Sequence, residues 1–157
     1  MRLVCSAAAP FITLPASKTF WWRWLRKACA RGLKKTRAVV KPNLPADAQF
    51  RALVKVHLSI ILEDGNDFIP VMLYNWRCLD EVHQRRLIAT KDEYDAIWQN
   101  AVNGLHNAGF LGGDTKFARL MVLGAMNFMV TWYKPKRGDN LDTLSDKVVA
   151  FFLSQHA

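Results

Sequence analysis

Cysteine, long apolar runs and acidic residues near the N-terminus are the scarce features of this 157-residue sequence. Its three cysteines, Cys5, Cys29 and Cys78, lack the spacing of a metal site, so we expect neither a disulfide scaffold nor a zinc module. With so few cysteines, we expect the protein to be located in a reducing compartment. No window holds the roughly 18 consecutive apolar residues of a membrane-spanning helix, so no membrane partner is expected. With 51% hydrophobic and 22% charged residues, the chain has the composition of one folded domain with a core.

Motifs that would indicate an enzyme are also missing. The histidines, His57, His83, His106 and His156, form no metal-binding pattern with carboxylates, and there is no HExxH, no G-x-S-x-G and no glycine loop for phosphate. We therefore expect a protein that is not an enzyme, with no catalytic residue, no metal and no resident cofactor.

Acidic residues are absent from the first 46 positions, which carry ten Lys and Arg and three of the six Trp. The rest of the chain carries twelve basic and thirteen acidic residues, so the net charge of +9 is N-terminal in origin. This change divides the chain into an atypical basic segment, residues 1–45, and a domain over residues 46–157. Three interpretations of the basic segment stay open: a nucleic-acid-binding arm, a targeting peptide, or a stretch translated out of frame.

The periodicity of the second region is helical, and no stretch alternates with period two for long enough to indicate a sheet. Helices are expected between residues 47 and 64, 81 and 108, 116 and 132, and 142 and 155, with a short segment over 68–76. Asp47, Asp80 and Asp114 are the expected N-caps, and Gly65 and Gly109 should end the helices before them. The predicted fold class is therefore all-α.

His57 interrupts an apolar helical stripe, and two interpretations of it remain open. It is either a core histidine with a hydrogen-bond partner or a polar group that contacts a ligand in a pocket. Trp76, Trp98, Met121 and Met126 likewise belong either to the core or to the wall of a cavity.

The helix expected over residues 116–132 is apolar on nearly every side. Such a helix must be covered on all sides, and one small domain cannot supply all of that cover. The pattern therefore indicates a partner chain. Gly124 and Ala125, in the middle of the helix, would let a second backbone come close.

Six short motifs, in this order and spacing, resemble a known family: Asn75–Leu79, Gln84–Arg86, Lys91–Tyr94, Gly109–Leu111, Gly124–Asn127 and Thr131–Pro135. Over roughly residues 47–157 the chain resembles the C-terminal regulatory domain of TetR-family transcriptional regulators. It looks nearest to the branch that controls fatty-acid and steroid degradation. The resemblance implies a helical bundle whose last two helices form a four-helix bundle in a homodimer.

The resemblance also implies two sets of site residues. The dimer interface would be formed by Leu120, Leu123, Gly124, Asn127, Phe128, Thr131, Val148, Phe151 and Phe152. A pocket for a small apolar effector, in that branch commonly an acyl-CoA or a related lipid, would be lined by His57, Ile61, Phe68, Met72, Trp76, Trp98 and Met121. The expected function is that of a ligand-responsive regulator, a repressor of the bacterial cytoplasm, which in the intact family binds operator DNA.

The chain departs from the family at its N-terminus, where members carry a DNA-binding head of helix-turn-helix type. Residues 1–45 show no such pattern, so no DNA-binding residue can be assigned. We hypothesise that a frameshift upstream of about Lys34 has replaced the head, because the out-of-frame junction of the Trp21 and Trp22 codons must encode Val and favourable codons around it spell a helix-like sequence. A helix over residues 19–40 is still expected, and the nucleotide sequence would test the hypothesis.

Two other classes of function stay open. One is a small helical adaptor or nucleic-acid-binding protein that works through its basic N-terminal arm. The other is a lipid or acyl-CoA carrier whose pocket is its whole function. Salt dependence would identify the first class, because nonspecific binding to nucleic acid falls steeply with salt and tolerates any sequence.

Overall fold

The computed structural model describes residues 18–63, 81–134 and 138–153, and every regular element within these ranges is helical. This confirms the expected all-α class. The elements are α1 (Lys18–Val39), α2 (Ala46–Leu62), α4 (Glu81–Asn107), α5 (Thr115–Phe128), the 3-10 turn η2 (Met129–Thr131) and α6 (Leu141–Leu153). The expected segment over 68–76 lies outside the described residues.

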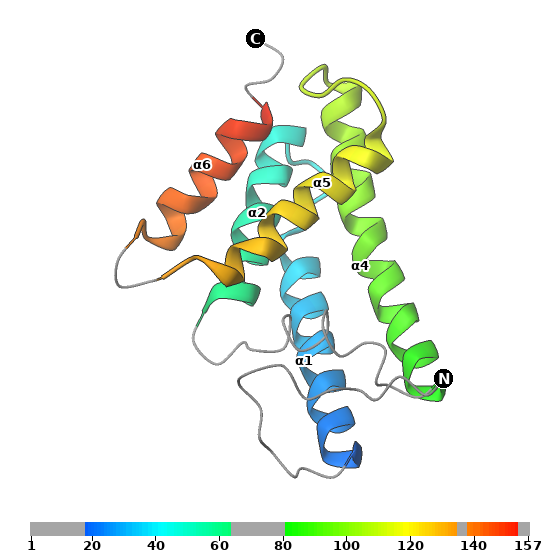
Figure 1. The fold of residues 1–157 in the computed structure, drawn as a ribbon. Coiled ribbons are helices and arrows are strands. Elements are labelled where there is room, and N and C mark those ends of the chain that lie inside the picture. Colours follow the sequence, from blue (N-terminus) through cyan, green and yellow to red (C-terminus); the bar gives the residue numbers. More distant parts are fainter. Residues whose placement is uncertain (1–17, 64–80, 135–137, 154–157) are drawn as a thin grey trace, which may run out of the picture.

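Helix α2 is the centre of the fold, and α1, α4, α5 and α6 all contact it. Figure 1 shows α6 on one side of α2 and α4 on the other, with α5 crossing them. The predicted stripe of α2 is buried, including Phe50, Leu53 and Val54. Each such large apolar side chain stabilises the fold by about 1.5–3 kcal/mol when it leaves water.

Helix α1 confirms the expected helix over residues 19–40. Leu25, Ala28 and Leu33 are buried in the common core, so the apolar side of α1 is turned towards α2 and α4. Its basic residues from Arg23 onward remain at the surface. The basic segment therefore contributes to the core of the domain from Leu25 onward.

Two of the predicted helix ends are confirmed. The Asp114 carboxylate accepts hydrogen bonds from the backbone N–H groups of Lys116, at 2.8 Å, and Phe117, at 3.2 Å, and so caps α5. Beyond α4, Gly109 has a φ of 79°, and the N–H of Phe110 reaches back to the carbonyl of Leu105 at 2.9 Å. That bond closes a Schellman-type cap, which needs a left-handed residue and therefore favours glycine.

Other predicted boundaries were wrong by a few residues. Helix α2 begins at Ala46 after Pro45, without a side-chain cap, so Asp47 is not the N-cap but lies in the first turn. Pro45 is itself the N-cap, with a non-helical ψ of 148°, and the Asp47 carboxylate in the first turn still favours the positive end of the helix dipole. Helix α5 stops at Phe128 and tightens into η2. Asp80 and Gly65 lie outside the described residues.

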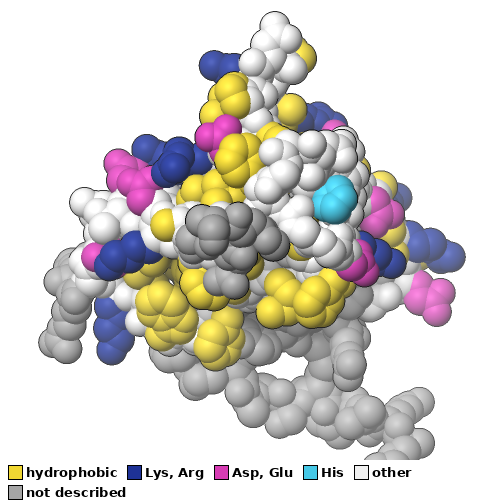
Figure 2. Space-filling model, turned by 90° about the horizontal axis from the view of Figure 1, so that it is seen from above, with side chains coloured by type: hydrophobic (Ala, Val, Ile, Leu, Met, Phe, Trp, Pro, Cys, Tyr) yellow, Lys and Arg dark blue, Asp and Glu magenta, His cyan; other side chains and the backbone are white. Residues whose placement is uncertain are grey.

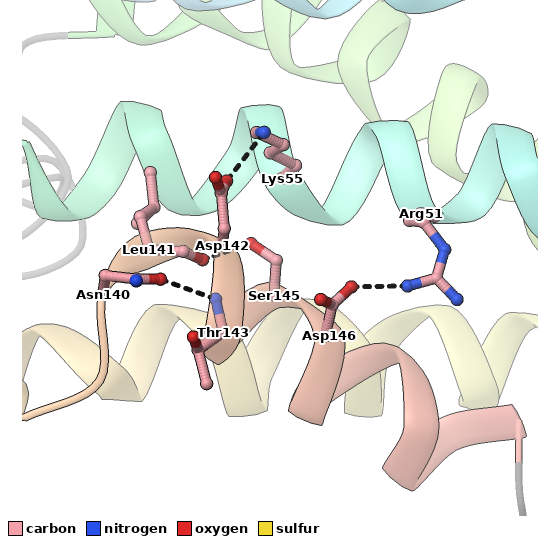
Figure 3. Close-up of polar contacts among 8 residues, drawn as sticks. All are labelled: Arg51, Lys55, Asn140, Leu141, Asp142, Thr143, Ser145 and Asp146. Carbon is pink, nitrogen blue, oxygen red and sulfur yellow. Dashed lines mark hydrogen bonds and ion pairs between the residues drawn. The ribbon is translucent and has the colours of Figure 1, made fainter.

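Helix α6 begins at Leu141, where the Asn140 side chain accepts a hydrogen bond from the N–H of Thr143 at 2.8 Å. Figure 3 shows two ion pairs that join α6 to α2: Arg51 to Asp146, at 2.5 Å, and Lys55 to Asp142, at 2.7 Å. All four side chains are exposed, so each pair contributes at most about 1 kcal/mol. The buried residues Leu144, Val148 and Val149 therefore hold α6 in place.

Within the described ranges, no helix combines the length and the apolar character needed to cross a membrane.

Candidate functional site

Four polar side chains meet inside the helical core, and we call them the inner polar cluster: His57 of α2, Tyr94 and Trp98 of α4, and Asn127 of α5. Tyr94 and Trp98 are four residues apart and therefore lie on the same face of α4. His57 Nδ1 lies 2.5 Å from the Tyr94 hydroxyl. The imidazole also meets the Trp98 ring edge-on, with centroids 5.7 Å apart. The cluster thus brings α2, α4 and α5 together.

Three atoms of the inner polar cluster have no hydrogen-bond partner within the described part of the chain: His57 Nε2, Trp98 Nε1 and Asn127 Oδ1. Each buried polar atom left in this state costs about 1–3 kcal/mol. His57 and Trp98 are almost completely buried, so bulk water does not replace the missing partners. Unsatisfied donors and acceptors inside an apolar core are the kind of groups that fix the orientation of a small ligand.

The inner polar cluster is uncharged at neutral pH. Burial lowers the pKa of His57 to about 4, and it raises the pKa of Tyr94 to about 12. Asn127 near His57 and Trp98 near Tyr94 partly offset these shifts, although neither pair has the geometry of a hydrogen bond. A neutral cluster of donors and acceptors suits an uncharged polar group, such as a carbonyl, better than an anion.

Of the seven residues predicted to line a pocket, the structure brings His57 and Trp98 together. Ile61 is buried on α2 in the same core. Met121 instead lies on the surface of α5, and its side chain is 51% exposed. Phe68, Met72 and Trp76 lie outside the described residues, so the pocket as a whole stays a prediction.

Sequence reasoning missed Tyr94 as a member of the cluster. Tyr94 lies four residues before Trp98, so the helical spacing already placed both side chains on the inward face of α4. That spacing could have identified Tyr94 as a neighbour of His57. Asn127 was predicted for the dimer interface, yet its Oδ1 atom is buried close to His57. Because α5 is apolar on nearly every side, its periodicity does not show whether Asn127 faces the core or a partner chain.

A second feature lies on the other side of α5, and we call it the outer apolar face: Phe117, Leu120, Met121, Gly124 and Phe128. These residues recur at i, i+3, i+4, i+7 and i+11, so they line one side of the helix. Its four large side chains are 51–64% exposed. A Cβ atom added at Gly124 would meet nothing within 4 Å. Figure 2 shows hydrophobic side chains in several groups on the face of the molecule that is seen from above.

The predicted interface residues divide into three groups. Those exposed are Leu120, Gly124, Phe128, Thr131 and Phe151; those partly buried are Leu123, Asn127 and Phe152; and Val148 is buried in the core. Met121 and Trp132, which lie in the stretch expected at the dimer face, are also exposed, and so is Phe117, which was not predicted. The same helical spacing could have identified Phe117. Whether this set forms an interface stays a prediction.

A polar network fixes α5 against α4. Arg119 of α5 lies 3.2 Å from the carboxylate of Asp95, and its Nε donates to the side-chain oxygen of Gln99 at 3.0 Å. Lys91 approaches the same carboxylate at 2.5 Å. The Arg119 side chain is largely buried, which strengthens these charge-assisted contacts relative to the exposed pairs of α6. The outer apolar face and the inner polar cluster are therefore held on opposite sides of one fixed helix.

A depression of about 220 Å³ lies at the connection between α5 and α6, between Trp132, Tyr133 and Leu144. It is smaller than the roughly 300–1,000 Å³ of typical small-molecule sites.

In the described ranges, no group of three or more His, Cys, Asp and Glu residues is placed to hold a metal ion.

Comparison with known proteins identifies similar sequences and folds. Residues 43–155 match the family model described as tetracyclin repressor-like, C-terminal domain. No curated protein matches the chain. A TetR-family transcriptional regulator from Bordetella parapertussis 12822 has a similar structure, with 24% identity, a TM-score of 0.73, and coverage of 84% of this chain and 69% of that one.

Two further solved structures are similar. Ketosteroid transcriptional regulator KstR2 of Mycobacterium tuberculosis has a TM-score of 0.74 at 13% identity and covers 85% of this chain and 69% of its own. AibR, in complex with isovaleryl coenzyme A and operator DNA, has a TM-score of 0.69 at 14% identity, with coverage of 84% and 74%. At such identities these likenesses show a shared fold.

Proposed function

Because this chain belongs to the TetR family of transcriptional regulators, whose C-terminal domain matches residues 43–155, we propose that it is the sensor and dimerisation domain of a ligand-responsive regulator. The observation that carries this proposal is the outer apolar face. Contiguous apolar surface of this kind is rare on a monomer and is typical of a protein interface. A second copy of the chain is the occupant that the family membership favours.

The proposed dimer is symmetric. In a two-fold arrangement each outer apolar face packs on the same face of the partner, so one patch supplies both halves of the interface. Gly124 lies in the middle of that patch with open space in front of it. A glycine there lets the two α5 backbones approach closely, and Phe117 and Phe128 at either end would pack around the contact.

Gly124→Glu tests the proposed dimer. The monomer should accept this change, because the added side chain meets open space and glycine is a poor helix former. The dimer should not, because two carboxylates would be buried at its centre. We expect sedimentation velocity to show self-association weakened at least about tenfold, which is about 1.4 kcal/mol.

The control is Asn100→Glu, which adds the same charge at an exposed position of α4. It should leave the assembly unchanged. A wild-type chain that stays monomeric at high concentration would overturn the dimer proposal. So would a Gly124→Glu variant that associates as tightly as the wild type.

We further propose that the effector is an apolar acyl-CoA or a related lipid whose carbonyl group reaches the inner polar cluster. Support comes from the neutral donors and acceptors buried there and from the apolar residues around them. AibR, which shares the fold, was crystallised with isovaleryl coenzyme A. A lipid carrier without regulatory function would show the same binding but no effect on DNA.

Isovaleryl coenzyme A is the probe for this proposal, with free coenzyme A as its control. The acyl compound should raise the melting temperature of the chain and coenzyme A alone should not, because only the acyl group enters the core. Trp98→Phe removes the unsatisfied indole N–H, which is a donor for the acyl carbonyl, so it should weaken binding about fivefold to tenfold. Equal shifts with the two compounds would contradict an acyl site.

We also propose that the intact regulator is a repressor that acts in the bacterial cytoplasm. Effector binding would favour a conformation whose DNA-binding heads no longer fit the spacing of the operator half-sites. The frameshift hypothesis for the segment upstream of Lys34 remains a prediction. The nucleotide sequence tests it, because an alternative frame interrupted by stop codons would exclude it.

A further inference from the structure

The outward side of α1 carries only positive charge. Arg23, Arg26, Lys27, Arg31 and Lys34 are all exposed, and we call them the α1 basic face. Arg23, Lys27, Arg31 and Lys34 follow one another at helical spacing, so they form a stripe. At 1.5 Å per residue the stripe is about 17 Å long. Buried residues such as Leu25 and Ala28 occupy the opposite side of the helix.

These five cations have no acidic partner in the described part of the chain. The neighbouring cations do: Lys35 lies 3.5 Å from Glu63, and Arg37 pairs with Glu93. The helix itself contains no Asp or Glu. Like charges one helical turn apart repel each other and weaken the helix. The α1 basic face therefore does not serve folding, and a polyanion bound along it would relieve the repulsion.

The chemistry of the face favours nucleic acid over other polyanions. A membrane-binding helix needs an exposed apolar side next to its cations, but the large apolar side chains of α1 whose burial is described, Leu25 and Leu33, are packed in the core. A protein partner would need apolar or aromatic anchors, and the exposed neighbours of the cations that are described are small, such as Ala30 and Ala38. Phosphate groups need neither, because displaced counterions supply the affinity and arginine binds phosphate oxygens in pairs.

We propose that the α1 basic face binds the phosphate backbone of double-stranded nucleic acid without reading its sequence. This interaction is separate from operator recognition by a helix-turn-helix head and does not depend on the proposed dimer or effector. Because the cations project from a helix that is anchored in the core from Leu25 onward, a bound duplex would lie against the sensor domain itself. This sequence-independent binding would also raise the local concentration of the protein on DNA.

The test measures binding of the full chain to duplexes of about 20 base pairs and unrelated sequence, by fluorescence anisotropy at several salt concentrations. All duplexes should bind alike. If all five cations contact phosphates, the logarithm of the binding constant should fall with the logarithm of salt at a slope of roughly −4.5. The double variant Lys27→Gln/Arg31→Gln should reduce this slope by about 2 and weaken binding at least about tenfold near 0.1 M salt. Glutamine keeps the helix propensity of α1.

The matched control is Lys55→Gln/Lys147→Gln, which removes the same net charge from α2 and α6, and it should bind nearly as the wild type does. Equal loss in the two double variants would overturn the proposal, because the whole protein's charge would then suffice. A large preference for one duplex sequence would also overturn it. Tighter binding to vesicles containing phosphatidylserine than to any duplex would assign the face to a membrane instead. Circular dichroism verifies that both double variants remain as helical as the wild type.

Discussion

Trp98→Ala lowers the free energy of unfolding by about 3–5 kcal/mol, as expected for the removal of a large aromatic side chain from a core. Trp98 is the largest fully buried residue of the chain's described part. It packs edge-on against both Phe50, with centroids 6.1 Å apart, and His57, at 5.7 Å. Alanine would leave a cavity between α2 and α4 that these helices can close only partly. A domain of this size has only about 5–15 kcal/mol of stability, so the variant loses a large share of it.

Urea denaturation followed by circular dichroism measures this effect. Trp132→Ala is the matched control, because Trp132 is about half exposed and its removal leaves no internal cavity. At protein concentrations where the wild type is monomeric, we expect the control to change stability by no more than about 0.5 kcal/mol. Similar losses in the two variants would show that the contact of Trp98 with Phe50 and His57 is not the centre of the core.

The helices could be predicted from sequence because their signals are local. The apolar spacing of α2, the Asp114 cap and the Gly109 turn all depend on residues within two helical turns of each other. Two helix ends differ from the prediction: the start of α2 near Asp47 and the end of α5 at Phe128. These ends depend on small differences in free energy between competing backbone hydrogen bonds. Periodicity does not resolve those differences.

The orientation of α5 could not be predicted in the same way. Its sequence is apolar on nearly every side, so no face of it is marked as inward. The structure turns Met126 into the core and Met121 to the surface, although both have the same chemistry. That orientation depends on contacts between helices, among them those of Arg119 of α5 with Asp95 and Gln99 of α4. The same holds for the meeting of His57 with Tyr94, which depends on how α2 and α4 pack.

Lowering the pH from about 6.5 to 4 removes about 3 kcal/mol of stability through His57 alone. Burial lowers the pKa of His57 from its ordinary 6.5 to about 4 in the folded chain. Between these two values the unfolded chain binds a proton that the folded chain does not, so stability rises with pH across this window and is fully present above it. Each pKa unit corresponds to about 1.4 kcal/mol.

The variant His57→Gln isolates this contribution, because glutamine does not titrate and can still hydrogen-bond to the Tyr94 hydroxyl. Carboxylates titrate near the lower end of the same window, so the quantity to measure is the difference in unfolding free energy between wild type and variant at each pH. That difference should shift by about 3 kcal/mol in favour of the variant as the pH falls through the window. Parallel curves for wild type and His57→Gln would show that the imidazole reaches water and that the inner polar cluster is not the closed, neutral site described above.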